Sequence, residues 1–143
     1  MEDEILGELK YNGGWSKIEK IQIWGSEINL KITVSAYENE TPNSNQQAAY
    51  KRFKDELDNI TKISQKKLFE YIEYIKEEVM TYSGIKEIPK DILKIVSPKE
   101  VLFLENGNFA VLCNALWDKH GVAVLCRECD IVVGPQDIVW KYE

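Results

Sequence analysis

The sequence has no long hydrophobic run, and no apolar stretch approaches the roughly 20 residues that a transmembrane helix needs. We therefore expect no membrane span. The first residues, Met1-Glu2-Asp3-Glu4, are acidic and lack the basic character that opens a secretory signal. Cysteine is scarce as well: three cysteines, an odd number, do not suit a disulfide framework and fit a reducing compartment. Together these absences predict a cytoplasmic protein.

Positive charge is also in short supply. The 18 lysine and arginine residues are outnumbered by 24 aspartate and glutamate residues, and the net charge is -6. Because nucleic-acid phosphates are bound mainly by lysine and arginine, this balance disfavours a nucleic-acid partner and favours a basic protein. The 143 residues and the 44% hydrophobic content suit one core, so we expect a single domain over residues 1–143.

Alternating residues predict a hairpin near the start of the chain. Apolar and polar side chains alternate strictly over residues 27–36, which indicates a strand with one buried face. Trp15 to Trp24 is predicted to be its partner strand. A two-residue turn at Gly25-Ser26 would pair Ile23 with Ile28, so that the apolar faces of the two strands coincide.

The middle of the chain is predicted to be helical from Thr41-Pro42, since threonine suits the N-cap and proline the first helical position. Apolar residues then recur at helical spacing: Phe53, Leu57, Ile60, Leu68, Ile72, Ile75 and Val79. One helix of about 40 residues would run roughly 60 Å, longer than the roughly 35–40 Å diameter of a compact domain of this size. We therefore predict two helices with a break near Asn59 to Ser64, the second ending at Ser83-Gly84.

Three further strands are predicted over residues 101–104, 109–113 and 122–126. Asn106-Gly107 is a strong turn signal between the first two, and residues 118–121 are predicted to form the second loop. Phe109 to Trp117 is apolar on both faces apart from one asparagine, which is typical of a strand inside a sheet.

These elements predict an α+β fold in which two antiparallel β-meanders flank two central helices. The N-terminal meander has three strands, the first within residues 6–11, and the C-terminal meander has the three strands just described. Together they build one antiparallel sheet or two abutting ones, and the helices pack on one sheet face.

A zinc-like set of residues is present, because Cys126 and Cys129 form a C-x-x-C motif and Cys113 and His120 are near in sequence. In the predicted hairpin Cys113 faces Cys126, whereas roughly 20 Å of extended chain separates His120 from Cys126. Zinc ligands lie within about 2.3 Å of the metal, so we expect no metal, and we expect no other cofactor. Cys113 and Cys126 are then small core residues or, alternatively, partners in a reversible disulfide.

The loop Trp117-Asp118-Lys119-His120-Gly121 is the candidate site. His120 is the single histidine, and histidine is the usual general base of enzymes, so it could form an acid–base pair with Asp118, with Asp137 available as a third group. The alternative is turn chemistry, in which aspartate starts a turn and glycine supplies a positive φ. We expect turn chemistry and assign no catalytic residue.

Acidic and aromatic side chains suggest a candidate interface. The acidic clusters are mostly solvated faces that could meet a basic partner, and the tryptophans fall beside turns, where they either fill the core or contact a partner. The candidate interface residues are Asp55, Glu56, Asp58, Glu77, Glu78, Trp15 and Trp24.

Short motifs stand near both ends of the chain. They are Gly7-Glu8-Leu9-Lys10-Tyr11 with Gly14-Trp15, then Leu116-Trp117-Asp118 with His120-Gly121, and Gly134-Pro135-Gln136-Asp137. In these motifs the chain resembles a loose group of uncharacterised bacterial domains of unknown function. Some members of that group lie in gene neighbourhoods of toxin–immunity systems, so the resemblance implies an immunity role.

The favoured hypothesis is a small acidic binding module, of immunity type, that neutralises a basic partner. The alternatives are a small-molecule-binding protein or enzyme that uses Asp118, His120 and Asp137, and a homo-oligomeric scaffold that pairs through a sheet edge. A deep pocket joining those three side chains would favour the first alternative, whereas a flat or convex acidic face would favour the binding module. The oligomeric state stays open.

Overall fold

The computed structural model describes residues 1–141, so Tyr142 and Glu143, which the expected single domain includes, lie outside the described residues. The elements in chain order are β1 (Glu2–Asp3), β2 (Gly7–Glu8), β3 (Lys10–Tyr11), β4 (Trp15–Ile23), β5 (Ser26–Val34), α1 (Ser44–Asp55), α2 (Leu57–Tyr74), α3 (Lys76–Ser83), the short 3-10 turn η1 (Ile92–Lys94), β6 (Val96–Phe103), β7 (Phe109–Ala115), β8 (Asp118–Cys126), β9 (Ile131–Pro135) and α4 (Ile138–Lys141).

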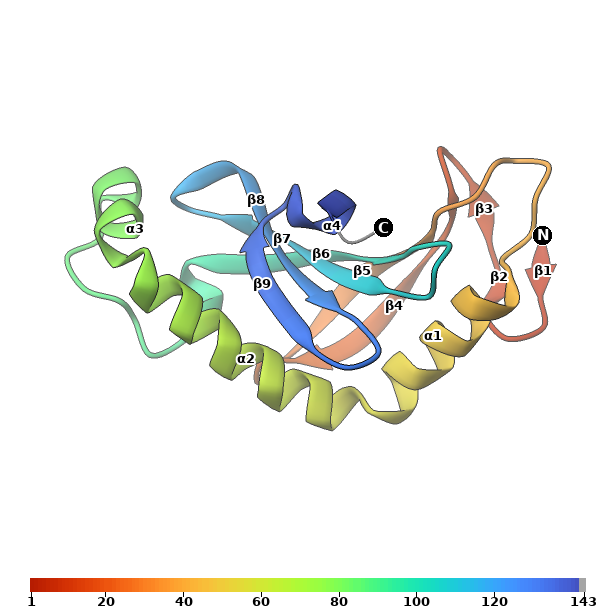
Figure 1. Cartoon of the computed structure of the whole chain (residues 1–143), viewed down its shortest axis with the longest axis horizontal. Helices are drawn as coiled ribbons and strands as arrows, with labels where there is room; N and C mark the ends of the chain where they lie inside the picture. The colour runs from red at the N-terminus through yellow and green to blue at the C-terminus, as the bar shows by residue number, and fades with distance from the viewer. Residues whose placement is uncertain (142–143) are drawn as a thin grey trace.

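One seven-stranded sheet forms the centre of the molecule, in the order β3-β4-β5-β6-β7-β8-β9, while β1 and β2 pair with each other (Figure 1). The α+β prediction is confirmed, but the sheet is mixed, because β5 and β6 run parallel. Helices α1 to α3 carry the chain from the end of β5 back to the start of β6. Such a crossover lets β6 enter the sheet in the same direction as β5, which a tight hairpin turn cannot do.

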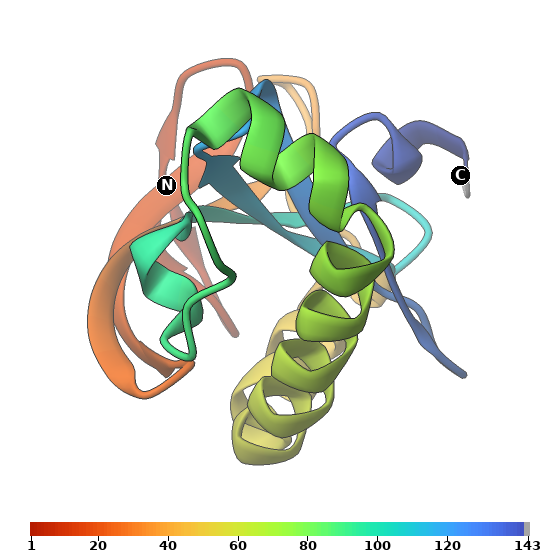
Figure 2. The same cartoon turned by 90° about the vertical axis from the view of Figure 1, so that its left-hand side faces the viewer.

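Helices α1, α2 and α3 follow one another along one side of the sheet (Figures 1 and 2). Phe53 and Leu68 on these helices belong to the larger apolar core. The short α4 lies on the opposite face, where Ile138 and Val139 pack in a second core with Leu112 of β7. The prediction that the central helices pack on one sheet face is confirmed, and α4, which the sequence pattern did not predict, lies on the other face. Among residues 1–141, no helix is both long and apolar enough to cross a membrane.

Strand β7 is buried on both faces, as predicted from its apolar composition. Val111 faces the core beneath the three long helices, and Leu112 faces the core beneath α4. The strand lies between β6 and β8, inside the sheet. Strand β9, which the sequence pattern did not predict, pairs antiparallel with β8.

The hairpin of β4 and β5 forms, but its predicted register is wrong. Ile21 faces Ile28 and Ile23 faces Ser26, so the turn is Trp24-Gly25 and the register differs by two residues. Both turn residues have positive φ, 48° at Trp24 and 87° at Gly25, as the favoured two-residue hairpin turns require. The indole N–H of Trp24 donates to Ser64 Oγ on α2 at 3.0 Å, and this buried contact holds an unusual backbone conformation in place.

The helical region also differs from its predicted boundaries. Helix α1 is capped by Asn43, whose side chain accepts from the N–H of Gln46 while the Gln46 side chain accepts from the N–H of Asn43, so Thr41 is not the cap. The chain breaks at Glu56 and again at Ile75, which gives three helices in place of two. The predicted break at Asn59 to Ser64 is wrong, because these residues lie inside α2. The end at Gly84 is confirmed: its N–H donates to Met80 O.

The hairpin of β7 and β8 turns earlier than predicted. Ala115 faces Asp118 and Cys113 faces Val122, so Leu116-Trp117 is the turn and the register shifts between these two pairs. Cys126 faces Phe109, so the predicted contact between Cys113 and Cys126 is wrong. Residues 119–121 therefore belong to an irregular stretch of β8 and not to a loop; Lys119 and His120 are exposed, whereas Gly121 is buried.

Gly121 makes this irregular pairing possible. Its φ is +84°, and a Cβ at this position would lie 2.4 Å from the backbone oxygen of Cys113. Only a residue without a side chain lets β8 approach β7 so closely. Gly121 is therefore a close-approach residue between two strands and not the last residue of a loop.

A half-buried polar cluster fixes α1 to the sheet. Lys17 and Glu19 of β4 face the helix, and the Tyr50 hydroxyl donates to Glu19 Oε1 at 2.6 Å. Lys54 pairs with the other oxygen of Glu19, and Lys17 Nζ contacts both Tyr50 and Glu19. Burial, together with the charge of Lys17, lowers the pKa of Lys54. Because each charged group has a partner within the cluster, we interpret it as a structural anchor.

Candidate functional site

The structure brings part of the predicted site and part of the predicted interface onto one surface. Asp118 and His120, at the start of β8, line a groove of about 550 Å³ together with Glu78 and Tyr82 of α3. The turn between β7 and β8 lies beside α3 at one end of the molecule (Figure 1). We call this region the α3 surface and define it by Glu73, Tyr74, Glu77, Glu78, Tyr82, Leu116 and Asp118.

Three large apolar side chains on the α3 surface are open to solvent. Tyr74 is 88% exposed, Tyr82 is 71% exposed and Leu116, in the turn, is 58% exposed. Glu78 and Tyr82 are four residues apart on α3, a spacing that puts side chains on one face of a helix, and Tyr74, the last residue of α2, lines the same hollow as Glu78. Val79, on the other side of α3, is fully buried and holds the helix to the core. The fold thus presents an alternation of tyrosine and carboxylate outward.

Negative charge converges beneath this surface. The pKa of the half-buried Tyr71 phenol is raised, first by burial and then by the charges of Glu78, Asp118 and Asp137. Carboxylates from α3, from β8 and from the segment before α4 therefore all raise the pKa of the Tyr71 phenol. Two lysines lie in the same region, Lys76 at 3.7 Å from the Glu73 carboxylate and the exposed Lys119 in the groove, and the carboxylates of the α3 surface outnumber them. The arrangement favours a cationic group arriving from outside.

Among the described residues, no hydrogen bond or ion pair joins the side chains of Asp118, His120 and Asp137. Asp118 Oδ1 accepts the backbone N–H of His120 at 2.9 Å, which is the turn chemistry that aspartate commonly provides. The His120 side chain is exposed. Asp137 is not among the described residues that line the groove. Trp117 is buried and packs in the larger core, with one side toward the groove.

The remaining interface candidates lie elsewhere. Asp55, Glu56 and Asp58 are exposed at the break between α1 and α2. The 18 residues of α2, or about 27 Å at 1.5 Å per residue, separate them from Glu77 and Glu78. The two acidic clusters are therefore separate surfaces and can be tested against each other.

The two tryptophans of the candidate interface are engaged inside the protein. Trp24 is only 3% exposed, so its side chain cannot be a contact residue for a partner, and that part of the prediction is corrected. The Trp15 ring is half-buried, lies 5.1 Å from the Tyr11 ring and donates its N–H to Glu40 O at 2.6 Å. Both rings act as packing residues at the ends of β4.

Sequence inspection missed Tyr74, Tyr82 and Leu116. The available signal was the four-residue spacing of Tyr74, Glu78 and Tyr82, opposite the apolar stripe that ends at Val79. Leu116 gave no signal, because its exposure depends on the position of the turn. Within residues 1–141, no group of three or more histidine, cysteine, aspartate or glutamate side chains is arranged to hold a metal ion.

Comparison with known proteins places the chain in a family by sequence alone. The family described as a domain of unknown function (DUF6985) matches residues 5–140. No curated protein matches the chain. No solved structure matches it either.

Proposed function

The chain belongs to the DUF6985 family of domains of unknown function, and we propose that it is a binding module that recognises a basic protein through the α3 surface. The observation that carries this proposal is the exposed alternation of Tyr74, Glu78 and Tyr82 beside Leu116. Exposed aromatic rings next to carboxylates suit lysine and arginine, since the ring face attracts a cation and the carboxylate pairs with it. Tyrosine is also enriched among the residues that dominate binding energy.

The shape of the surface supports recognition more than catalysis. The Asp118 carboxylate accepts the backbone N–H of His120. Both residues line the groove, and Asp137 is not among the described residues that line it. A nucleophile or base needs a third group to orient it, and among the described residues no hydrogen bond or ion pair joins the His120 side chain to Glu78, Asp118 or Asp137. A carboxylate that accepts a backbone N–H keeps other lone pairs free for a lysine or arginine of a partner.

We further propose that binding neutralises the partner, as an immunity-type protein neutralises its toxin, and that the encounter takes place in the cytoplasm. The net charge of -6 supports fast association with a basic protein, because complementary charges steer the encounter. A reducing compartment suits three cysteines that are free thiols.

Comparative affinity capture from the native cells tests the proposal. The baits are the wild-type protein, a Glu77→Lys/Glu78→Lys variant and an Asp55→Lys/Asp58→Lys variant. The last is the matched control, since it reverses the same number of exposed helical carboxylates on a separate surface. We expect one basic protein to be retained by the wild type and by the control and lost by the α3 variant.

Two results would contradict the proposal. Equal loss with both variants would mean that retention follows net charge and not the α3 surface. Retention of the same partner by both variants would mean that the partner binds another face. Circular dichroism of each bait checks that the charge reversals leave the fold intact.

A further inference from the structure

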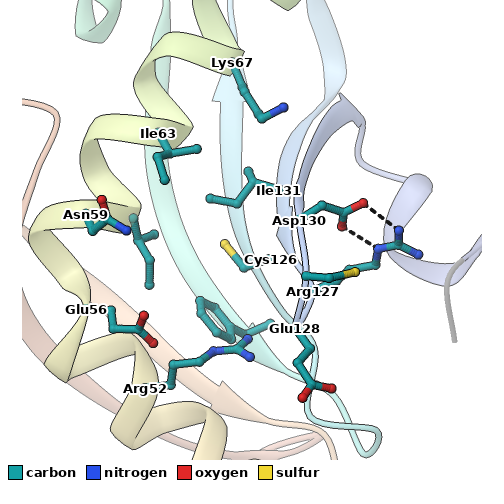
Figure 3. Close-up of a pocket in the computed structure, with 13 residues that line it drawn as sticks. Arg52, Glu56, Asn59, Ile63, Lys67, Cys126, Arg127, Glu128, Asp130 and Ile131 are labelled. Carbon is teal, nitrogen blue, oxygen red and sulfur yellow. Dashed lines mark hydrogen bonds and ion pairs between the residues drawn. The ribbon is translucent and has the colours of Figure 1, made fainter.

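A second hollow lies at the opposite end of α2, between the break of the helix and the turn that joins β8 to β9. Its volume is about 370 Å³, within the range of small-molecule sites. Figure 3 shows Ile63, Ile131 and the thiol of Cys126 pointing into the space between α2 and the sheet. Phe109, which is fully buried, forms part of the same wall.

The apolar part of this cavity is left open by the fold. Ile63 is 38% exposed although it is a large apolar side chain on the helix face that points to the sheet (Figure 3). Ile60 and Ile131 are partly buried beside it. A ligand that covered these side chains would gain roughly 25 cal/mol for each Å² of apolar surface removed from water.

Arg52 supplies an unpaired cation at one end of the cavity. Its guanidinium lies 5.0 Å from the centre of the Phe109 ring, which holds the side chain in place. Within residues 1–141, no carboxylate lies at ion-pair distance from Arg52. A planar guanidinium with free N–H groups is matched to a carboxylate, which it binds through two parallel hydrogen bonds.

The other charges leave this cation available. Arg127 and Asp130 form a two-bond pair, at 2.7 Å for each bond, and the Arg127 side chain points away from the cavity (Figure 3). Lys67 adds a second cation at the opposite end of the cavity. Glu56 and Glu128 also line the cavity near Arg52, and among the described residues neither carboxylate lies at ion-pair distance from its guanidinium (Figure 3).

We propose that this cavity binds a small carboxylic acid with an apolar body. The carboxylate would pair with Arg52, and the apolar body would lie against Ile60, Ile63 and Ile131. The proposal is independent of the α3 surface, because α2 separates the two regions. The same protein can therefore bind a small acid at one end and a basic partner at the other.

Titration by NMR with three probes tests the proposal. Phenylbutyrate has both features, phenylbutanol lacks the carboxylate, and butyrate lacks most of the apolar body. Amide shifts around Ile63 and Cys126 should saturate with phenylbutyrate at a lower concentration than with either of the others. A charge-assisted hydrogen bond contributes about 1.5–3 kcal/mol, so phenylbutanol should bind roughly 10–100-fold more weakly.

Two variants separate the cavity from general charge effects. Arg52→Gln should weaken phenylbutyrate binding by about tenfold or more and leave phenylbutanol unchanged. Lys51→Gln, which removes a cation from an exposed neighbour on α1, is the matched control and should change neither. If Arg52→Gln is poorly folded, Ile63→Ser on the cavity rim provides a second variant, and it should weaken both aromatic probes.

Several outcomes would overturn the proposal. The proposal is wrong if millimolar phenylbutyrate causes no saturable amide shift at the cavity. It is also wrong if the amide shifts are confined to another surface. Equal affinity for phenylbutyrate and phenylbutanol would show that Arg52 does not bind the carboxylate. An equal loss of phenylbutyrate affinity in Arg52→Gln and Lys51→Gln would show that the effect follows the net charge of the protein.

Discussion

Substituting Gly121 by alanine tests the pairing of β7 with β8, on which the position of the α3 surface depends. The new Cβ would lie 2.4 Å from Cys113 O and 3.1 Å from Gln136 Oε1. The first neighbour is backbone, so the strands must move apart. The left-handed φ of +84° adds about 1–2 kcal/mol of strain for any L-residue, and overpacking adds about 1–3 kcal/mol. We expect a total loss of roughly 2–5 kcal/mol in the free energy of unfolding.

Gly25→Ala is the matched control for this substitution. Gly25 has nearly the same φ, +87°, and nothing lies within 4 Å of the position of its Cβ. It should therefore lose only the strain of about 1–2 kcal/mol. Urea unfolding followed by circular dichroism measures both differences, provided that the slope with denaturant stays constant.

The comparison can refute the reasoning directly. If residues 118–121 formed a loop at the tip of the hairpin, Gly121 would be exposed, and its alanine variant would lose only what Gly25→Ala loses. Equal losses would therefore show that the turn is at residues 118–121 and that Leu116 is not displayed beside α3.

Other predictions concern the thiols and the buried indole. A disulfide reagent should modify Cys129 rapidly in the folded protein and the buried Cys113 and Cys126 only on unfolding, and rapid reaction of all three would contradict the burial. Burial raises the pKa of Cys113 and of Cys126 to about 12 from an ordinary value near 9, so both stay protonated in the folded state where the unfolded thiols ionise. The free energy of unfolding should therefore fall as pH rises above about 9, and Cys126→Val should flatten that decline; an equal decline in both proteins would refute this. Ser64→Ala leaves the buried Trp24 N–H without its acceptor and should cost about 1–3 kcal/mol in urea unfolding, whereas a neutral result would show that the indole is hydrated.

Local patterns predicted the elements better than their registers. The strict alternation over residues 27–36 and the apolar run from Phe109 were sufficient to identify β5 and β7. A strand buried on one face alternates apolar and polar residues, whereas a strand buried on both faces is apolar throughout. Register depends on which residues form the turn. At Trp24-Gly25 that choice is stabilised by a hydrogen bond to Ser64, 40 residues away, and no local pattern contains that contact.

The helix breaks and the parallel strand pair show the same limit. The length of the helical region correctly predicted a break in it, but the polar residues that end at Ser64 suggested the wrong place. Ser64 lies inside α2, and its hydroxyl accepts the indole N–H of Trp24. Nothing in the composition of β5 or β6 indicates their relative direction, which follows from the course of the three helices between them. Glu78 and Asp118 were predicted as candidates separately, and only the folded chain brings them together beside Tyr82.

The most direct measurement for the central claim is an NMR titration with a peptide rich in lysine and arginine. Amide shifts should concentrate on α3 and on the turn from Leu116 to Asp118. They should diminish as salt approaches physiological strength, where charges are screened over about 8 Å. Glu77→Lys/Glu78→Lys should abolish the shifts, and Asp55→Lys/Asp58→Lys should leave them. Shifts that spread evenly over the acidic residues, or that centre on the break between α1 and α2, would contradict recognition through the α3 surface.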